Sequence, residues 1–197
     1  AGDAAYAYLQ QAGVECDEPY IFTDKHLHAE WTFIEMLDER LSSTDAIAVA
    51  VGSGTINDLC KLCSYHQQRP YMCVATAASV DGYSSFGASI TYKNMKQTFT
   101  CPAPKAILAD VGVMAKAPAE MTAAGYADLA AKIPAGAEWI IADFLGVEPI
   151  HDVAWHIVQD SLKESLADPE GVAALRPEAI APFVEGLMLS GFAMQVA

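Results

Sequence analysis

The sequence predicts an α/β domain with a parallel sheet, followed by an all-helical domain. A continuously apolar run at residues 46–51 leads into Gly52-Ser53-Gly54 and then into a helical pattern. Arg69-Pro70 ends that pattern, and a second apolar run follows at residues 71–75. A strand, a helix and a second strand in this order form a crossover unit, and we expect both strands to be covered on both faces.

The second half of the chain has a different pattern. Beyond Met114 every segment reads as helix, with proline or glycine at its ends. The change divides the chain into an α/β domain of residues 1–115 and a helical domain of residues 116–197.

Local patterns predict further elements before residue 115. They are a helix that ends at Gly13, a strand at residues 19–22, an amphipathic helix at 29–41, a hairpin of 89–92 and 98–101 with its turn at 93–96, and a strand at 106–109.

Composition excludes several classes of protein. The chain has 197 residues, is 53% hydrophobic and carries a net charge of −14, which argues against disorder. Its two halves are both acidic, so nucleic acid and anionic membranes are poor partners. We expect no membrane span, because no apolar stretch reaches roughly 18 residues. The five cysteines are odd in number, which favours reduced thiols and a cytoplasmic location.

The glycine pair at residues 52–54 is the first candidate site. Gly52, Ser53, Gly54 and Thr55 lie between a buried strand and a helix, where backbone N–H groups and the helix dipole favour an anion. The standard dinucleotide fingerprint has a third glycine where this chain has Asn57. An ordinary tight turn explains the pattern about as well.

The segment after the second strand is the next candidate. Residues 76–85 follow the strand directly and include Thr76, Ser79, Asp81 and Ser85. Adjacent crossover strands place this segment beside the glycine turn, so these side chains could face one ligand. Alternatively, the hydroxyls satisfy the turns of their own loop.

Asp128 is an acid among small and apolar residues of the helical half. A carboxylate in such surroundings usually has a partner, which could be a metal ion or Lys132. A solvated position on a helix face is the alternative.

Three segments together resemble a known family. Residues 51–58, 76–83 and 124–132, in this order and at this spacing, resemble the sn-glycerol-1-phosphate dehydrogenases, and the bacterial form made with arabinose-utilisation proteins looks nearest. That family lies within the glycerol dehydrogenase and dehydroquinate synthase-like superfamily.

The resemblance implies a nucleotide-binding domain, a helical domain, and a nicotinamide cofactor, NAD or NADP. By motif match, cofactor contacts fall to Gly52, Ser53, Gly54, Thr55, Thr76, Ser79 and Ser85. Asp81 and Asp128 would bind the substrate, and Asp128 would also be catalytic and a ligand of a divalent metal, Zn²⁺ or Ni²⁺.

The resemblance also implies that parts are missing. The family's two histidine ligands follow a helix that residues 185–197 resemble, and its first strand would precede Ala1, so we expect a longer polypeptide. The histidines present are not expected to replace them. His151 and His156 are five residues apart, about 140° around a helix, and His26, His28 and His66 lie in the first domain. Cys60 and Cys63 have redox spacing but lie inside a predicted helix.

The resemblance therefore implies a metal-dependent oxidoreductase that interconverts sn-glycerol 1-phosphate and dihydroxyacetone phosphate by hydride transfer. The expected partner is a small-molecule substrate, and a homo-oligomer is possible. Alternatives are a glycerol dehydrogenase for unphosphorylated glycerol, a dehydroquinate synthase-like lyase, and an inactive nucleotide-binding fragment.

Overall fold

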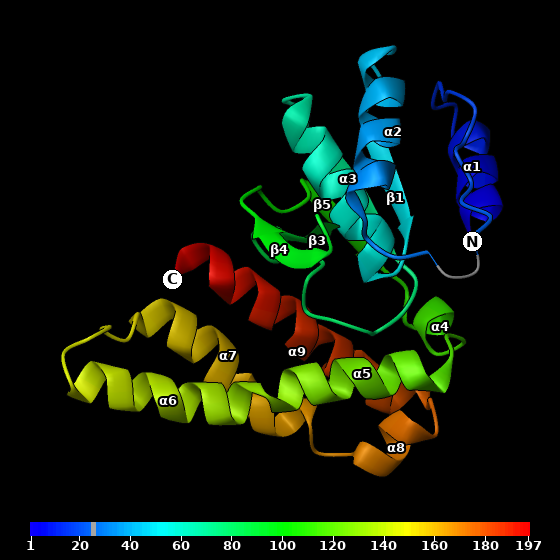
Figure 1. The fold of residues 1–197 in the computed structure, drawn as a ribbon. Coiled ribbons are helices and arrows are strands. Elements are labelled where there is room, and N and C mark those ends of the chain that lie inside the picture. Colours follow the sequence, from blue (N-terminus) through cyan, green and yellow to red (C-terminus); the bar gives the residue numbers. More distant parts are fainter. Residues whose placement is uncertain (25–26) are drawn as a thin grey trace. The chain divides into compact units, whose positions relative to one another are not determined.

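The computed structural model describes residues 1–24 and 27–197, and the chain divides into two compact units (Figure 1). Unit 1 consists of Ala1–Thr76 and Gly87–Leu108, and unit 2 consists of Ala77–Phe86 and Ala109–Ala197. The loop Ala77–Phe86 thus belongs with the helical part of the chain.

Unit 1 contains the predicted crossover. Strand β1 (Ala48–Gly52) runs into helix α3 (Gly54–His66), and strand β2 (Tyr71–Ala75) pairs with β1 in parallel. Strand β5 (Ala106–Ala109) completes a three-stranded sheet of order β1-β2-β5. The prediction that both strands are covered on both faces is wrong for β1, because this edge strand leaves Val49 36% exposed among the described residues.

The remaining elements of unit 1 are helical or form a hairpin. They are α1 (Gly2–Gln11), α2 (Trp31–Ser42), β3 (Ala88–Tyr92) and β4 (Met95–Phe99). Gly13 ends the first helix region with φ +76°, as predicted. The hairpin is confirmed, but its turn has two residues and its second strand is Met95–Phe99 rather than the predicted 98–101. Lys93 and Asn94 both have positive φ, which suits a tight turn between twisted strands.

The predicted strand at residues 19–22 is wrong. Among residues 1–24 and 27–197 this segment has no strand partner, and its aromatic side chains make its ring contacts. The rings of Tyr20 and Phe22 lie 4.9 Å apart edge to face, and Phe22 contacts Phe33 of α2 in the same way at 5.7 Å. Tyr20 and Ile21 are 41% and 47% exposed, so this apolar run is neither part of a sheet nor fully buried.

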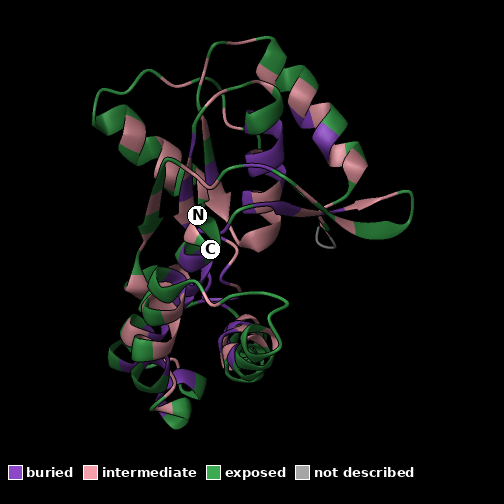
Figure 2. Cartoon of the chain, turned by 90° about the vertical axis from the view of Figure 1, so that its left-hand side faces the viewer, coloured by how far each residue is buried: buried purple, intermediate pink, exposed green. Residues whose placement is uncertain are grey.

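The core of unit 1 lies between α2, α3 and the hairpin. Buried apolar side chains come from all three, and they include Ile34, Leu37, Leu59, Leu62 and Ile90. Figure 2 colours the buried parts of the chain purple. Burial of each such side chain contributes roughly 1.5–3 kcal/mol. This packing holds α3 in place behind the glycine turn.

Unit 2 is helical, as predicted. It contains α4 (Val111–Met114), α5 (Ala119–Ala130), α6 (Lys132–Phe144), α7 (Asp152–Ser165), α8 (Pro169–Ala173) and α9 (Pro177–Val196). Helix α9 packs against α4, α5, α7 and α8 and supplies the centre of the unit.

Helix α9 differs from one expectation. It is long and apolar enough, by length and composition, to cross a membrane, although the sequence led us to expect no such stretch. Glu178 and Glu185 interrupt the apolar run, yet the mean hydropathy of its best window is still 1.4. Half of that window is buried in the protein, as in a core helix.

Candidate functional site

The glycine turn is built by backbone geometry. Gly52 ends β1, and Ser53 is extended at the N-cap of α3, with φ −84° and ψ −174°. A Cβ on Gly52 would overlap the side chain of Ile56, so the turn is too tight for a larger residue. The residues from Gly52 to Thr55 are half-buried, and by helix geometry the first N–H groups of α3 have no partner within the helix.

Asn57 stands where a dinucleotide fingerprint has its third glycine, and it has a structural use. Its side chain is buried, and the hydroxyl of Tyr71 donates to its Oδ1 at 3.0 Å. Since Tyr71 begins β2, this bond ties the first turn of α3 to the neighbouring strand.

Thr76 lies beside the glycine turn, as the crossover predicts. Gly52 pairs with Ala75, and the Thr76 N–H donates to the Gly52 carbonyl at 3.1 Å. The carboxyl ends of both strands therefore meet at one edge of the sheet. The other predicted cofactor residues, Ser79 and Ser85, belong to unit 2, so their convergence on the turn stays a prediction.

Most hydroxyls of the loop Ala77–Phe86 have partners within the loop, whereas Ser84 Oγ donates to the Met188 carbonyl of α9 at 2.7 Å. Ser85 Oγ donates to the Gly82 carbonyl at 3.2 Å, and Ser79 Oγ lies 3.5 Å from the hydroxyl of Tyr83. That hydroxyl in turn donates to the Ala77 carbonyl at 2.8 Å. These contacts agree with the alternative in which the loop satisfies its own turns.

Two helical glycines let this loop approach closely. A Cβ on Gly125 of α5 would overlap the carbonyl of Ala78, and a Cβ on Gly191 of α9 would overlap the carbonyl of Asp81. The loop backbone therefore lies directly on both helices. This contact places Asp81 next to Asp128 of α5 and Ser190 of α9.

Asp81, Asp128, Lys132 and Ser190 form a cluster within unit 2, hereafter the carboxylate cluster. The Asp81 N–H donates to Asp128 Oδ2 at 2.9 Å. Asp81 Oδ2 accepts from Ser190 Oγ at 2.9 Å and lies 2.8 Å from Lys132 Nζ. Lys132 Nζ is also 3.5 Å from Asp128 Oδ1. Two of the three segments that carry the family resemblance thus meet here.

Burial and charge oppose each other in this cluster. Burial raises the pKa of Asp81, although the Lys132 ammonium and the Ser190 hydroxyl act in the opposite direction. For Lys132, burial alone would lower the pKa, but the two carboxylates outweigh it and raise the pKa. Lys132 is therefore a stable cation at neutral pH.

The carboxylate of Asp128 is suited to be one ligand of a metal ion. Its side chain is 31% exposed, and its contacts with Lys132 and the Asp81 N–H use only part of the acceptor capacity of its two oxygens. Within residues 1–24 and 27–197, however, no group of three or more His, Cys, Asp or Glu side chains could hold a metal ion. The described residues thus supply one expected ligand and leave the rest of the set unfilled.

The described histidines have other partners or positions. His66 Nδ1 lies 2.6 Å from Asp38, His156 pairs with Asp160 on α7, and His151 caps that helix. His26 lies outside the described residues. The pair Cys60 and Cys63 lies inside α3, as predicted, and all five cysteines are free thiols.

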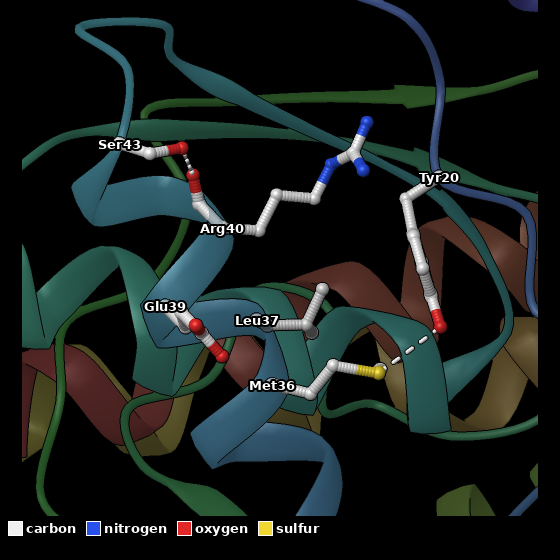
Figure 3. A pocket seen from close by; sticks show the side chains of 6 residues that line it. All are labelled: Tyr20, Met36, Leu37, Glu39, Arg40 and Ser43. Atoms are coloured by element: carbon white, nitrogen blue, oxygen red, sulfur yellow. Dashed lines mark hydrogen bonds between the residues drawn. The ribbon is translucent and has the colours of Figure 1, made fainter.

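A surface hollow of about 290 Å³ lies beside α2, and none of the predicted site residues lines it (Figure 3). In it, the Tyr20 hydroxyl donates to the sulfur of Met36 at 3.1 Å, and Ser43 Oγ donates to the Arg40 carbonyl. Arg40 itself donates to the Glu18 carbonyl at 2.7 Å. Tyr20, Arg40 and Ser43 are thus paired within the chain, and we do not take the hollow as a candidate site.

The chain thus combines a strand-turn-helix edge in an α/β unit with a carboxylate cluster in a helical unit. The pattern of the iron-containing alcohol dehydrogenases matches residues 1–118. The chain belongs to that family.

Relatives and solved structures agree with this assignment. A protein of Bacillus licheniformis named glycerol-1-phosphate dehydrogenase [NAD(P)+] is 37% identical over 150 residues, which are 76% of this chain and 37% of the relative. A Pyrococcus horikoshii protein of the same name is 35% identical over 76% of this chain and 43% of its own length. The chain thus spans about two fifths of these relatives.

A solved glycerol dehydrogenase from Schizosaccharomyces pombe has a TM-score of 0.75 at 18% identity, over 97% of this chain and 50% of that one. At this identity the likeness shows the fold alone. It confirms the predicted fold class.

Sequence reasoning missed Ser190 and the reach of Lys132 to Asp81. Ser190 is 109 residues from Asp81, and only its position as a buried hydroxyl in an apolar helix sets it apart. The i,i+4 spacing predicted that Lys132 pairs with Asp128, but it gave no indication that Lys132 also contacts Asp81.

Proposed function

We propose that this chain carries the cofactor turn and the substrate carboxylates of an NAD(P)-dependent enzyme that interconverts sn-glycerol 1-phosphate and dihydroxyacetone phosphate. The observation that carries the proposal is the bond from the Asp81 N–H to Asp128, because it joins two segments that resemble this enzyme family. The names of the relatives support the same activity.

The chemistry of the carboxylate cluster suits a polyol. Hydroxyl groups donate hydrogen bonds, and Asp81 and Asp128 present acceptor oxygens with side-chain exposures of 10% and 31%. In the oxidative direction, hydride leaves the carbinol carbon for the nicotinamide, and a proton leaves the hydroxyl oxygen. Asp128 would orient that hydroxyl by accepting its hydrogen bond. A divalent metal at Asp128, when bound, would polarise the substrate oxygen.

The glycine turn suits the pyrophosphate of the cofactor. The chain is strongly acidic, with net charge −14, so an anion needs a local source of positive potential. The N-terminus of α3 supplies it through aligned N–H groups behind a turn without bulky side chains. Thr76, Ser79 and Ser85 would line the rest of the cofactor.

We further propose Zn²⁺ or Ni²⁺ as the metal, since one carboxylate and two imidazoles suit both. NAD and NADP both remain candidate cofactors. A homo-oligomer in the cytoplasm, with no nucleic acid or membrane partner, completes the proposal.

The test is an assay of the full-length protein with NADH or NADPH, dihydroxyacetone phosphate, and Zn²⁺ or Ni²⁺. Metal-dependent oxidation of the reduced cofactor supports the proposal, and its absence contradicts it. Dihydroxyacetone without phosphate is the matched substrate control. Faster turnover of that compound would identify a glycerol dehydrogenase instead.

Calorimetry with NADH on the 197-residue chain tests the alternative of an inactive nucleotide-binding fragment. NADH binding by a full-length protein that shows no turnover would indicate a nucleotide-binding module. Binding that depends on Gly52 would support the turn as the cofactor site.

A further inference from the structure

Lys132 lies at different distances from the two carboxylates of the cluster. Its Nζ lies 2.8 Å from Asp81 Oδ2 and 3.5 Å from Asp128 Oδ1. The shorter distance is that of a charge-assisted hydrogen bond, whereas the longer one is a looser ion pair. The ammonium is therefore mainly the partner of Asp81.

The two carboxylates also differ in what else they contact. Asp81 Oδ2 accepts a second hydrogen bond from Ser190, and the Asp81 side chain is only 10% exposed. Asp128 accepts one backbone N–H on Oδ2, and its side chain is 31% exposed. Asp81 is thus already bonded to Lys132 and Ser190, whereas Asp128 is more accessible to a cation from solvent.

We propose that Lys132 is a positioning residue that withholds Asp81 from divalent cations and leaves Asp128 as the cation ligand. The inference rests on the proposed function for the role of Asp128 as a metal ligand and for that of Asp81 toward the substrate. The cation preference itself follows from the contacts within the carboxylate cluster.

The physical basis is competition between positive charges. An ammonium at hydrogen-bond distance from Asp81 repels a divalent cation that approaches the same oxygen. Removal of that charge leaves two adjacent carboxylates, which together attract a divalent cation more strongly than Asp128 does beside Lys132. Loss of Lys132 is therefore expected to tighten cation binding, whereas damage to the fold would weaken it.

The experiment measures Mn²⁺ affinity of the full-length protein by electron paramagnetic resonance of the free ion. Mn²⁺ is the probe because it prefers oxygen ligands to thiols. We expect Lys132→Gln to bind Mn²⁺ about tenfold more tightly than wild type, as the loss of one nearby positive charge implies. The amide of the introduced side chain can still donate to Asp81, which preserves the packing.

Three controls assign the effect. Lys132→Arg keeps the charge and should bind Mn²⁺ as wild type does. Lys163→Gln removes an exposed lysine of α7 and should have less than a twofold effect, which separates local from overall charge. Adding Asp128→Asn to Lys132→Gln should remove the gain. Equal, weaker or absent Mn²⁺ binding by a folded Lys132→Gln protein would overturn the proposal.

A second measurement needs no substitution. On titration of wild-type protein with Mg²⁺, the carboxyl ¹³C resonance of Asp128 should shift, and that of Asp81 should stay close to its starting position. An equal or larger shift at Asp81, or no shift at Asp128, contradicts the inference even where the Lys132 variants do not fold. Both measurements are independent of turnover, so failure of the proposed enzyme activity would be recognised separately.

Discussion

The glycine turn and the carboxylate cluster are two kinds of site built by one chain. The turn consists of backbone groups of consecutive residues between β1 and α3. Its N-cap residue, Ser53, makes no side-chain capping bond. The cluster uses side chains from a loop, the α5–α6 junction and α9. We therefore expect substitutions to act through backbone space at the turn and through charge at the cluster.

The largest effect should come from the charge of Asp128. Asp128→Asn keeps an oxygen for the Asp81 N–H but loses the negative charge beside Lys132. We expect kcat/KM for dihydroxyacetone phosphate to fall about 1000-fold. The matched control is Asp160→Asn, an exposed acid of α7, which should have little effect. A loss of less than tenfold in a folded variant would argue against a catalytic Asp128.

A smaller effect is expected where the cluster depends on close backbone approach. Gly125→Ala places a Cβ against the carbonyl of Ala78, so the loop that carries Asp81 must move. We expect the free energy of unfolding, from urea titration, to fall by about 3 kcal/mol.

Gly136→Ala is the control for that prediction. Its Cβ meets the side chain of Gln159, which can move aside, and alanine favours helix formation. The change should therefore stay within about 1 kcal/mol of wild type. Equal destabilisation by both substitutions would show that close contact with the loop is not the reason for a glycine at position 125.

These two regions also explain what the sequence could predict. The turn lies within a run of neighbouring residues, so an apolar strand, a glycine pair and a helical pattern revealed it directly. Asp128 and Lys132 could be paired from helical spacing. Ser190 could not be found in this way, because α9 comes to Asp81 only through tertiary packing at Gly191.

The same physics explains the wrong strand at residues 19–22. Local apolar character predicts burial, but a strand also needs a hydrogen-bonding neighbour. Tyr20 and Phe22 make ring contacts instead, and Phe22 also contacts Phe33 of α2, while Tyr20 stays 41% exposed. The hairpin turn was placed correctly and only its length was wrong, because positive φ at Lys93 and Asn94 closes it in two residues.

A moderate effect is expected at the glycine turn. Gly52→Ala puts a Cβ into the space of the Ile56 side chain, which shifts the start of α3. We expect NADH affinity, measured by calorimetry, to weaken about tenfold, or about 1.4 kcal/mol. Ser53→Ala should change it less than twofold, since the serine side chain makes no cap bond. The reverse order of effects would mean that side chains hold the cofactor.

The last prediction concerns the reactivity of the cysteine thiols, which reports whether the helix behind the glycine turn stays closed to solvent. Burial raises the pKa of Cys60 of α3 and Cys73 of β2 to about 12, and that of Cys101 to about 11, from an ordinary value of 9.0. The folded state thus binds more protons than the unfolded state above pH 9, so the protein loses stability as pH rises from about 9 toward 12. At pH 8 a thiol reagent should modify Cys16 first and the partly exposed Cys60 more slowly, because the thiolate is the reactive form. The buried Cys63, Cys73 and Cys101 should react only on unfolding. Rapid labelling of the buried Cys63 of α3 in folded protein, read by mass spectrometry of peptides, would show that α3 opens readily, and would contradict a rigid backbone site at the turn.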